Sequence, residues 1–125
     1  MKAISSSTGP AAIGTYSPAI QAGNTVYISG QIPLDPTTQA LCSEEITAQI
    51  EQVIKNLDSI CVAAGGSLAK VVKITVYLLD LAHFNVVNEL MAKYFSVPYP
   101  ARAVIQVAGL PRGAQIEMDA VMVLE

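Results

Sequence analysis

The chain has little charge for its size. Charged residues make up 14% of its 125 residues, whereas hydrophobic residues make up 52%. An average soluble domain has about a quarter of its residues charged. Because so little charge does not cover a monomer, the chain is expected to bury a large surface against a membrane or against copies of itself. No uninterrupted apolar run approaches the ~18 residues of a spanning helix, which favours self-association.

Residues that bind metals or form disulfides are also scarce. Cys42 and Cys61 are nineteen positions apart, and His83 is the one histidine. This spacing fits neither a zinc site nor a disulfide framework, so we expect two reduced, structural thiols. A nucleophilic serine elbow, a Gly-rich phosphate loop and a metal-ligand cluster are all missing. We therefore expect no metal and no cofactor.

The distribution of charge argues against some partners. The net charge is −3, and the seven Lys and Arg residues are scattered rather than clustered, so general affinity for nucleic acid is not expected. The first ten residues lack the apolar stretch of a secretory signal and the Arg-rich pattern of a transit peptide. We expect a cytoplasmic protein without a membrane partner.

Periodicity predicts one domain, residues 1–125, of the α+β class. A Gly-Asn turn joins two β-rich runs into a hairpin, and two later segments have apolar residues at helical spacing. We expect strands at 19–22 and 25–32, a helix capped by Ser43 and stopped by Gly65-Gly66, a strand at 70–79, a helix capped by Asp80 and ended at 97–100, and strands at 101–108 and 115–124. This order suits a mixed sheet with both helices on one face.

Strand alternation divides the residues between the helix face and a second face. The expected helix-face residues are Val26, Ile28 and Ile32, then Val72, Ile74, Val76 and Leu78, and finally Ile116, Met118, Ala120, Met122 and Leu124. The second face receives Tyr27, Ser29 and Gln31, then Val71, Lys73, Thr75, Tyr77 and Leu79, and finally Gln115, Glu117, Asp119, Val121 and Val123. That face is half apolar, which indicates a subunit interface containing polar pockets. We infer a homo-oligomer.

Two charged residues in apolar strands are the first candidates for chemistry. Arg102 lies at the head of a β-branched run, and it belongs to the second face if Ile105 and Val107 are core. It is suited to holding a ligand carboxylate, but pairing with a protein carboxylate at an interface is the alternative. Glu117 is either a site carboxylate or a solvated strand residue.

Other candidates lie in the first third of the chain. Gly30 follows Ser29 inside a strand, where glycine marks the close approach of a ligand or backbone, a bulge, or tight packing. Tyr16 lies in a loop that either closes over a substrate or packs its ring over the sheet edge.

Over essentially its whole length the sequence resembles the RidA family, also called the YjgF/YER057c/UK114 family. The family's terminal signature has an arginine between small residues and later an aliphatic-Glu-Met motif. Pro100-Ala101-Arg102-Ala103-Val104-Ile105, Ala108, Leu110 and Ile116-Glu117-Met118 match it. The Tyr16-Ser17 loop, the strand from Val26 to Gln31, Gly65-Gly66 and the helix from Phe84 to Phe95 with Asn88 also match.

The resemblance implies a chorismate-mutase-like α+β fold and a homotrimer with clefts between subunits. It also implies hydrolysis of imines and enamines, such as 2-aminoacrylate, to a 2-keto acid and ammonia. In that case Arg102 holds the substrate carboxylate and Glu117 positions the attacking water. Ser29 and Gly30 line the pocket, Tyr16 closes it and Asn88 is a structural support.

The chain departs from the family at one position. Many members carry a cysteine where this sequence has Val104, so any role of that thiol is lost. Hydrolysis of an imine does not need the thiol, because the iminium carbon is already electrophilic and only requires a held substrate and a positioned water. The backbone carbonyl of Val104 is still available to contact the substrate amine.

Two other functions stay open. The first is a non-enzymatic trimeric module that binds a keto acid or an amino acid as a metabolite sensor or protein partner. The second is the translation inhibition and ribonuclease activity reported in the family. The second has little support in this sequence, which lacks a basic stripe, an aromatic platform and a pair of histidines.

Overall fold

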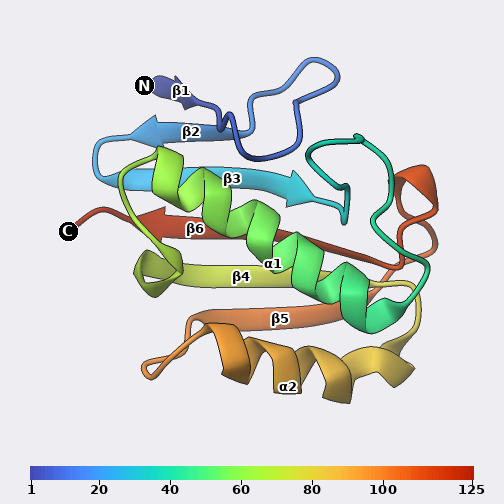
Figure 1. Cartoon of the computed structure of the whole chain (residues 1–125). Coiled ribbons are helices and arrows are strands. Elements are labelled where there is room, and N and C mark those ends of the chain that lie inside the picture. Colours follow the sequence, from blue (N-terminus) through green and yellow to red (C-terminus); the bar gives the residue numbers. More distant parts are fainter.

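The computed structural model covers all 125 residues and contains one six-stranded sheet and two α-helices (Figure 1). The strands lie in the order β1-β2-β3-β6-β4-β5, and every neighbouring pair is antiparallel except β4–β5. The elements are β1 (Lys2–Ile4), β2 (Ala19–Ala22), β3 (Thr25–Gln31), α1 (Ile46–Ala63), β4 (Val71–Leu78), α2 (Phe84–Tyr94), β5 (Ala101–Gln106) and β6 (Ile116–Val123). The predicted order of elements is confirmed.

Helix α1 ends where the sequence predicts but begins later. The amide of Gly65 donates to the Val62 carbonyl at 3.0 Å, and that of Gly66 donates to the Cys61 carbonyl at 2.9 Å. Gly65 has a φ of +93°, which glycine adopts without steric cost. The prediction of Ser43 as the cap is wrong, because its Oγ accepts from the Glu45 amide at 3.0 Å in a turn that precedes the helix.

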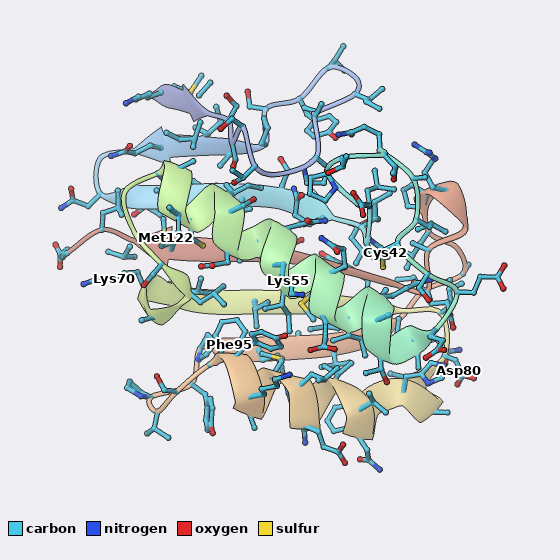
Figure 2. The ribbon with its side chains drawn as sticks, viewed as in Figure 1. Cys42, Lys55, Lys70, Asp80, Phe95 and Met122 are labelled. Atoms are coloured by element: carbon cyan, nitrogen blue, oxygen red, sulfur yellow. The ribbon has the colours of Figure 1, made fainter.

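Both helices pack on one face of the sheet and share one apolar core with it. Asp80 accepts a hydrogen bond from the Ala82 amide at 2.9 Å, and so caps the short 3-10 turn that leads into α2. Figure 2 shows Met122 of β6 beneath the C-terminal end of α1. The α+β prediction is confirmed. No helix in the chain combines the length and the apolar character that crossing a membrane requires.

Alternation predicts the faces of β6 correctly, but bulges change β3 and β4. In β6 the residues Ile116, Met118, Ala120 and Met122 are all buried. The β3–β6 register shifts between Ile28 and Gln31, so Gln31 is buried opposite Met118 instead of lying on the second face. The β4–β6 register shifts after Val71. Val71 is therefore buried and Val72 is exposed, the reverse of the prediction, because a bulge turns the next side chain to the other face.

Strand β5 is a sheet edge, and its faces differ from the expectation. It runs parallel to β4, with Ile74 beside Arg102 and Tyr77 beside Ile105. Ile74 is fully buried on the helix face, whereas Ile105 is 44% exposed. Arg102 therefore lies on the helix face rather than the second face. The prediction assumed that Ile105 was part of the core. Because both faces of β5 carry apolar residues, the sequence is equally compatible with Arg102 on the helix face and on the second face.

The second face of the sheet has no helix against it within this chain (Figure 1). Tyr27 and Ile105 are exposed there, and Tyr77, Glu117, Asp119 and Val121 are half-buried among their neighbours. This face keeps the mixture of apolar and polar residues that the sequence predicts for a subunit interface.

Candidate functional site

Four of the predicted site residues line one cavity. It has a volume of about 540 Å³ and lies beside the end of β3 and the start of β6. Tyr16, Ser29, Gly30 and Glu117 contribute to its wall. The other lining residues are mostly apolar and come from three loops, among them Pro10, Ile13, Pro18, Ile32, Leu34 and Pro111. A mainly apolar cavity with a few convergent polar groups is typical of a small-molecule site.

Gly30 makes room for the side chain of Glu117. A Cβ atom at position 30 would overlap with Oε2 of Glu117 and lie 2.9 Å from its Cδ. The Gly30 backbone also belongs to the β3 bulge, where the register against β6 shifts. Glycine is therefore needed at this position because the Glu117 carboxylate occupies the space that any other side chain would take.

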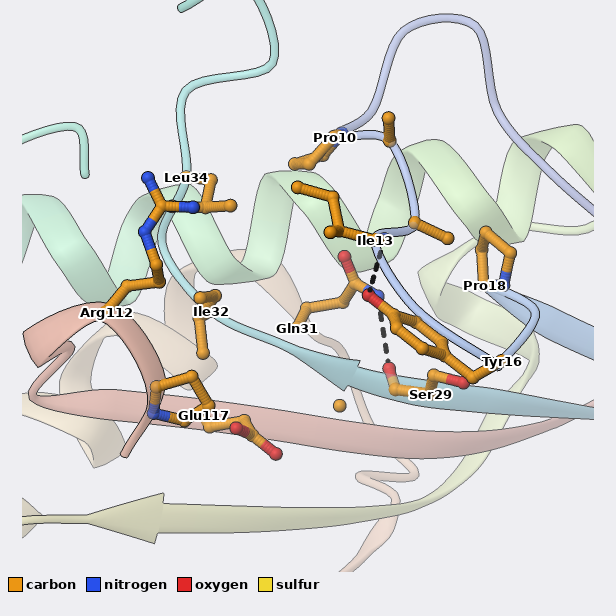
Figure 3. Close-up of a pocket in the computed structure, with 14 residues that line it drawn as sticks. Pro10, Ile13, Tyr16, Pro18, Ser29, Gln31, Ile32, Leu34, Arg112 and Glu117 are labelled. Carbon is orange, nitrogen blue, oxygen red and sulfur yellow. Dashed lines mark hydrogen bonds between the residues drawn. The ribbon is translucent and has the colours of Figure 1, made fainter. Parts of the chain in front are cut away.

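Ser29 fixes the loop that carries Tyr16. Its Oγ donates to the Ser17 carbonyl at 2.6 Å, and its amide donates to the Pro18 carbonyl at 2.9 Å. Tyr16 itself is 51% exposed, and its hydroxyl accepts from the Ile13 amide at 3.4 Å. Figure 3 shows the Tyr16 ring beside Ser29 at the cavity wall. The loop is thus anchored at its base, and its tyrosine is free to contact a ligand.

The environment of Glu117 favours the protonated carboxyl. Burial raises its pKa above the ordinary value of 4.5, and the nearby negative charge of Asp119 raises the pKa further. No cation neutralises it within the chain, since the one ion pair joins Lys93 and Glu51. A carboxylate that binds a proton more tightly than usual is a better general base near neutral pH.

Arg102 lies in a second cavity, of about 600 Å³, between α2 and the start of β5. Its Nη1 donates to Oδ1 of Asn88 at 2.6 Å, and its guanidinium carbon is 5.2 Å from the centre of the Phe84 ring. These contacts from one helix fix the orientation of the guanidinium. The side chain is still exposed, so its remaining N–H groups are accessible to a ligand carboxylate.

One chain does not bring Arg102 and Glu117 together. The two cavities have no lining residue in common, and the two side chains lie on opposite faces of the sheet. Asn88 lines the Arg102 cavity. Val104 lines neither cavity, and its side chain packs against the core. Because β5 is an edge strand, some of its backbone groups have no strand partner in this chain.

Three polar residues near Glu117 were not among the site residues predicted from the sequence. Arg112 lines the same cavity, and its Nη2 donates to the Gln39 carbonyl at 3.1 Å. In Figure 3 its guanidinium points away from the Glu117 carboxylate. Tyr77 and Asp119 are joined by a 2.6 Å hydrogen bond. Alternation had already placed both on the face of Glu117, so the signal for this pair was present in the sequence.

The titratable residues do not form a metal site. No group of three or more His, Cys, Asp or Glu side chains lies together. Cys42 and Cys61 are both free, and burial raises the pKa of the Cys61 thiol to about 12. Cys61 belongs to α1 and its side chain is part of the core, where an unreactive thiol acts as a small apolar side chain.

A family model and a curated relative both match nearly the whole chain. A family model described as "Endoribonuclease L-PSP" matches residues 6–124. A mouse (Mus musculus) protein named 2-iminobutanoate/2-iminopropanoate deaminase is 47% identical, over 98% of this chain and 90% of its own length.

Solved structures agree in fold along the whole chain. RidA from the Antarctic bacterium Psychrobacter sp. PAMC 21119 is 50% identical, with a TM-score of 0.95 over 98% of this chain and 99% of its own. TdcF from E. coli, solved with bound serine, is 33% identical, with a TM-score of 0.92 over 100% of both chains.

Proposed function

Because this chain belongs to the RidA family, described by its model as "Endoribonuclease L-PSP", we propose that it is an enzyme that deaminates reactive 2-imino and 2-enamino acids to 2-keto acids and ammonia. The relatives named as imine deaminases are 45–47% identical over 98% of the chain. Hydrolysis, the roles of individual residues and the subunit arrangement are inferred from the site itself.

The observation that carries the hydrolytic assignment is the state of the Glu117 carboxylate. It is half-buried beside Gly30 in a cavity, without a cation to neutralise it, and its pKa is raised by burial and by Asp119. Such a group is suited to take a proton from water and return it later. A structural carboxylate would be expected to have a basic partner.

The chemistry needs few groups. An enamine is first protonated at carbon and becomes an iminium ion, whose carbon is electrophilic. Glu117 accepts a proton from water as the water oxygen bonds to that carbon. The resulting carbinolamine takes this proton from Glu117 on its nitrogen, the C–N bond breaks, and ammonia leaves as the hydroxyl gives its proton to Glu117 and the C=O bond forms. One water molecule is consumed for each ammonia released, so no redox partner is required.

Arg102 holds the substrate carboxylate in this proposal. A guanidinium offers parallel N–H donors that match the two oxygens of a carboxylate, and Asn88 and Phe84 already orient it. Ser29 and Gly30 line the reacting end of the site, Tyr16 closes over it, and the Val104 backbone carbonyl contacts the substrate amine. Replacing Arg102 by Ala is expected to lower kcat/KM at least about tenfold, since hydrogen bonds to charged groups contribute about 1.5–3 kcal/mol.

The position of the two charged residues supports a site built between subunits. Arg102 and Glu117 lie in separate cavities on opposite faces of one sheet, so a substrate held by both must touch two chains. The half-apolar second face provides a surface for such an assembly. We take the assembly to be a homotrimer in which the Glu117 cavity of one subunit adjoins the Arg102 cavity of the next.

Binding without catalysis is the alternative with some support. TdcF from E. coli was solved with bound serine, so a protein of this fold holds an amino acid. Under this alternative the protein senses a keto acid or amino acid. Arg102 is needed for either function, whereas Glu117 is needed only for hydrolysis.

A coupled assay separates the two functions. A serine or cysteine lyase generates 2-aminoacrylate, and keto-acid release is measured with buffer, with wild-type protein and with Glu117→Gln. Deamination predicts acceleration by the wild type and loss of it in the variant, while the variant still binds a keto acid in a calorimetric titration. Equal rates with buffer and with wild-type protein would instead favour the binding module.

A further inference from the structure

Asp119 and Tyr77 form a connected pair beside Glu117. The Tyr77 hydroxyl donates to Oδ2 of Asp119 at 2.6 Å. Tyr77 lies directly opposite Glu117 in the β4–β6 register, and Asp119 lies opposite Thr75. Because Glu117 and Asp119 are two residues apart on one strand, their side chains project from the same face. Three polar side chains are thus held together on rigid strands rather than on loops.

Holding two carboxylates side by side costs electrostatic free energy, and no cation in the chain offsets this cost. Two carboxylates share a half-buried sheet face, where like charges repel. Neither is paired with a cation in the chain. Tyr77 donates its hydrogen bond to the second carboxylate and not to Glu117, which leaves the Glu117 oxygens free for a ligand or water.

We propose that Tyr77 and Asp119 hold a fixed negative charge beside Glu117 and thereby make the Glu117 carboxylate a stronger base toward the attacking water. This inference rests on the proposed deamination, and it makes Asp119 and Tyr77 positioning residues rather than catalytic ones. The hydrogen bond to Asp119 raises the pKa of Tyr77 to about 12, so the hydroxyl stays a donor across the working pH range. The charge of Asp119 contributes to the raised pKa of Glu117, as this arrangement requires.

The other charged groups around Glu117 are few. From the turn before β6, Arg112 lines the same cavity but donates to the Gln39 carbonyl. On β4, Lys73 lies opposite Val121, further along the face than Asp119. Ser29 and Gly30 of β3 add no charge, and neither does Tyr16 of the loop before β2. In an assembled site Arg102 of a neighbouring subunit would favour the charged form of Glu117, and this contribution is the same in every variant compared below.

The test reads the titration of Glu117 directly. The protein is labelled with ¹³C at the glutamate side-chain carboxyl, and the Glu117 resonance is assigned by its loss in Glu117→Gln. Its titration midpoint is then measured by NMR in the wild type, Asp119→Asn, Tyr77→Phe and the double variant. Thr75→Val is the matched control, since Thr75 is the cross-strand neighbour of Asp119 and carries no charge.

We expect the Glu117 midpoint to fall in Asp119→Asn and to stay in place in Thr75→Val. Tyr77→Phe should change the Glu117 midpoint when Asp119 is present but not in the Asp119→Asn background. The acidic limb of the kcat/KM profile should move to lower pH in Asp119→Asn, and the plateau should fall because a weaker base assists water less. An unchanged midpoint in Asp119→Asn would overturn the inference, and an equal effect of Tyr77→Phe in both backgrounds would show that Tyr77 acts directly on Glu117.

The measurement does not depend on turnover. If the wild type fails to accelerate keto-acid release, the proposed function fails while the NMR midpoints still report whether Asp119 acts on Glu117. If turnover is present and the midpoint does not respond to Asp119→Asn, only this inference fails.

Discussion

Gly30 and Glu117 fit against one another between β3 and β6, where the space of a Cβ atom at position 30 is filled by the Glu117 carboxylate. A glycine in the middle of a strand costs stability. At position 30 this loss of stability allows the Glu117 carboxylate to lie half-buried in the cavity wall with its oxygens free. The position of the proposed base therefore depends on a residue that has no side chain.

Replacing Gly30 by Ala tests this dependence. The methyl group should displace the Glu117 side chain, and kcat/KM should fall by about 100-fold, the effect of a misplacement on the order of 1 Å. Gly109→Ala is the control, because a Cβ there meets nothing within 4 Å. If Gly30→Ala keeps wild-type kinetics while Gly109→Ala does too, the carboxylate position seen here is not the working one.

Asn88 should affect substrate binding through Arg102. Its Oδ1 accepts from the Arg102 guanidinium at 2.6 Å, and Asn88→Ala removes this partner while leaving the cation. We expect KM to rise about three- to tenfold, with little change in kcat, because the cation stays and only its orientation is lost, a net effect of about 1 kcal/mol on substrate binding. Lys93→Ala on the same helix removes an exposed ion pair with Glu51 and a contact with the Tyr94 ring. Neither involves Arg102, so KM should stay unchanged. A fall in kcat alone in Asn88→Ala would place Asn88 in the chemical step.

A lysine on the open sheet face should break the assembly. Ile105 is 44% exposed on that face, so Ile105→Lys is tolerated by the single chain but puts an unpaired charge into a subunit interface. Light scattering should show a shift toward monomer. Val62→Lys is the control, because Val62 is 60% exposed at the end of α1. An unchanged mass for Ile105→Lys would mean that this face does not form the interface.

The raised pKa of Glu117 predicts a pH-dependent stability. The pKa of this carboxyl is higher in the folded protein than its unfolded value of about 4.5. Below pH 4.5 the group is protonated in both states and does not lower the free energy of unfolding. As the pH rises through the folded pKa, the carboxyl becomes charged in the folded protein and the free energy of unfolding falls. The comparison is made in the Arg102→Ala background, where no neighbouring guanidinium favours the charged form, and there Glu117→Gln should raise Tm at pH 8, with the difference vanishing near pH 4. A double variant that is less stable than Arg102→Ala at pH 8 would contradict the direction of the shift.

Much of the fold could be predicted because its periodicities are clean. Ile50, Ile54 and Leu57 repeat at helical spacing in α1 and are fully buried, and Ile116 to Met122 alternate without interruption in β6. The bulges at Ser29–Gly30 and after Val71 could not be predicted from alternation, because a single inserted residue reverses the faces without changing composition.

Part of the geometry of the candidate site was predicted. Tyr16, Ser29, Gly30 and Glu117 share one cavity, as the resemblance implied, and Arg102 contacts Asn88. The predicted face of Arg102 was wrong because both faces of β5 carry apolar residues, so the local pattern does not decide which face lies toward the helices. That depends on which strand β5 pairs with, and this pairing is a long-range property of the fold.

Mixing two inactive variants tests the central claim, that Arg102 and Glu117 of different subunits form one deaminating site. Arg102→Ala and Glu117→Gln are each purified, dissociated together, reassembled at equal amounts and assayed for keto-acid release from 2-aminoacrylate. Random reassembly gives about a quarter of the interfaces both intact residues, so turnover near a quarter of wild type is predicted. A reassembled mixture as inactive as either variant alone would contradict the account.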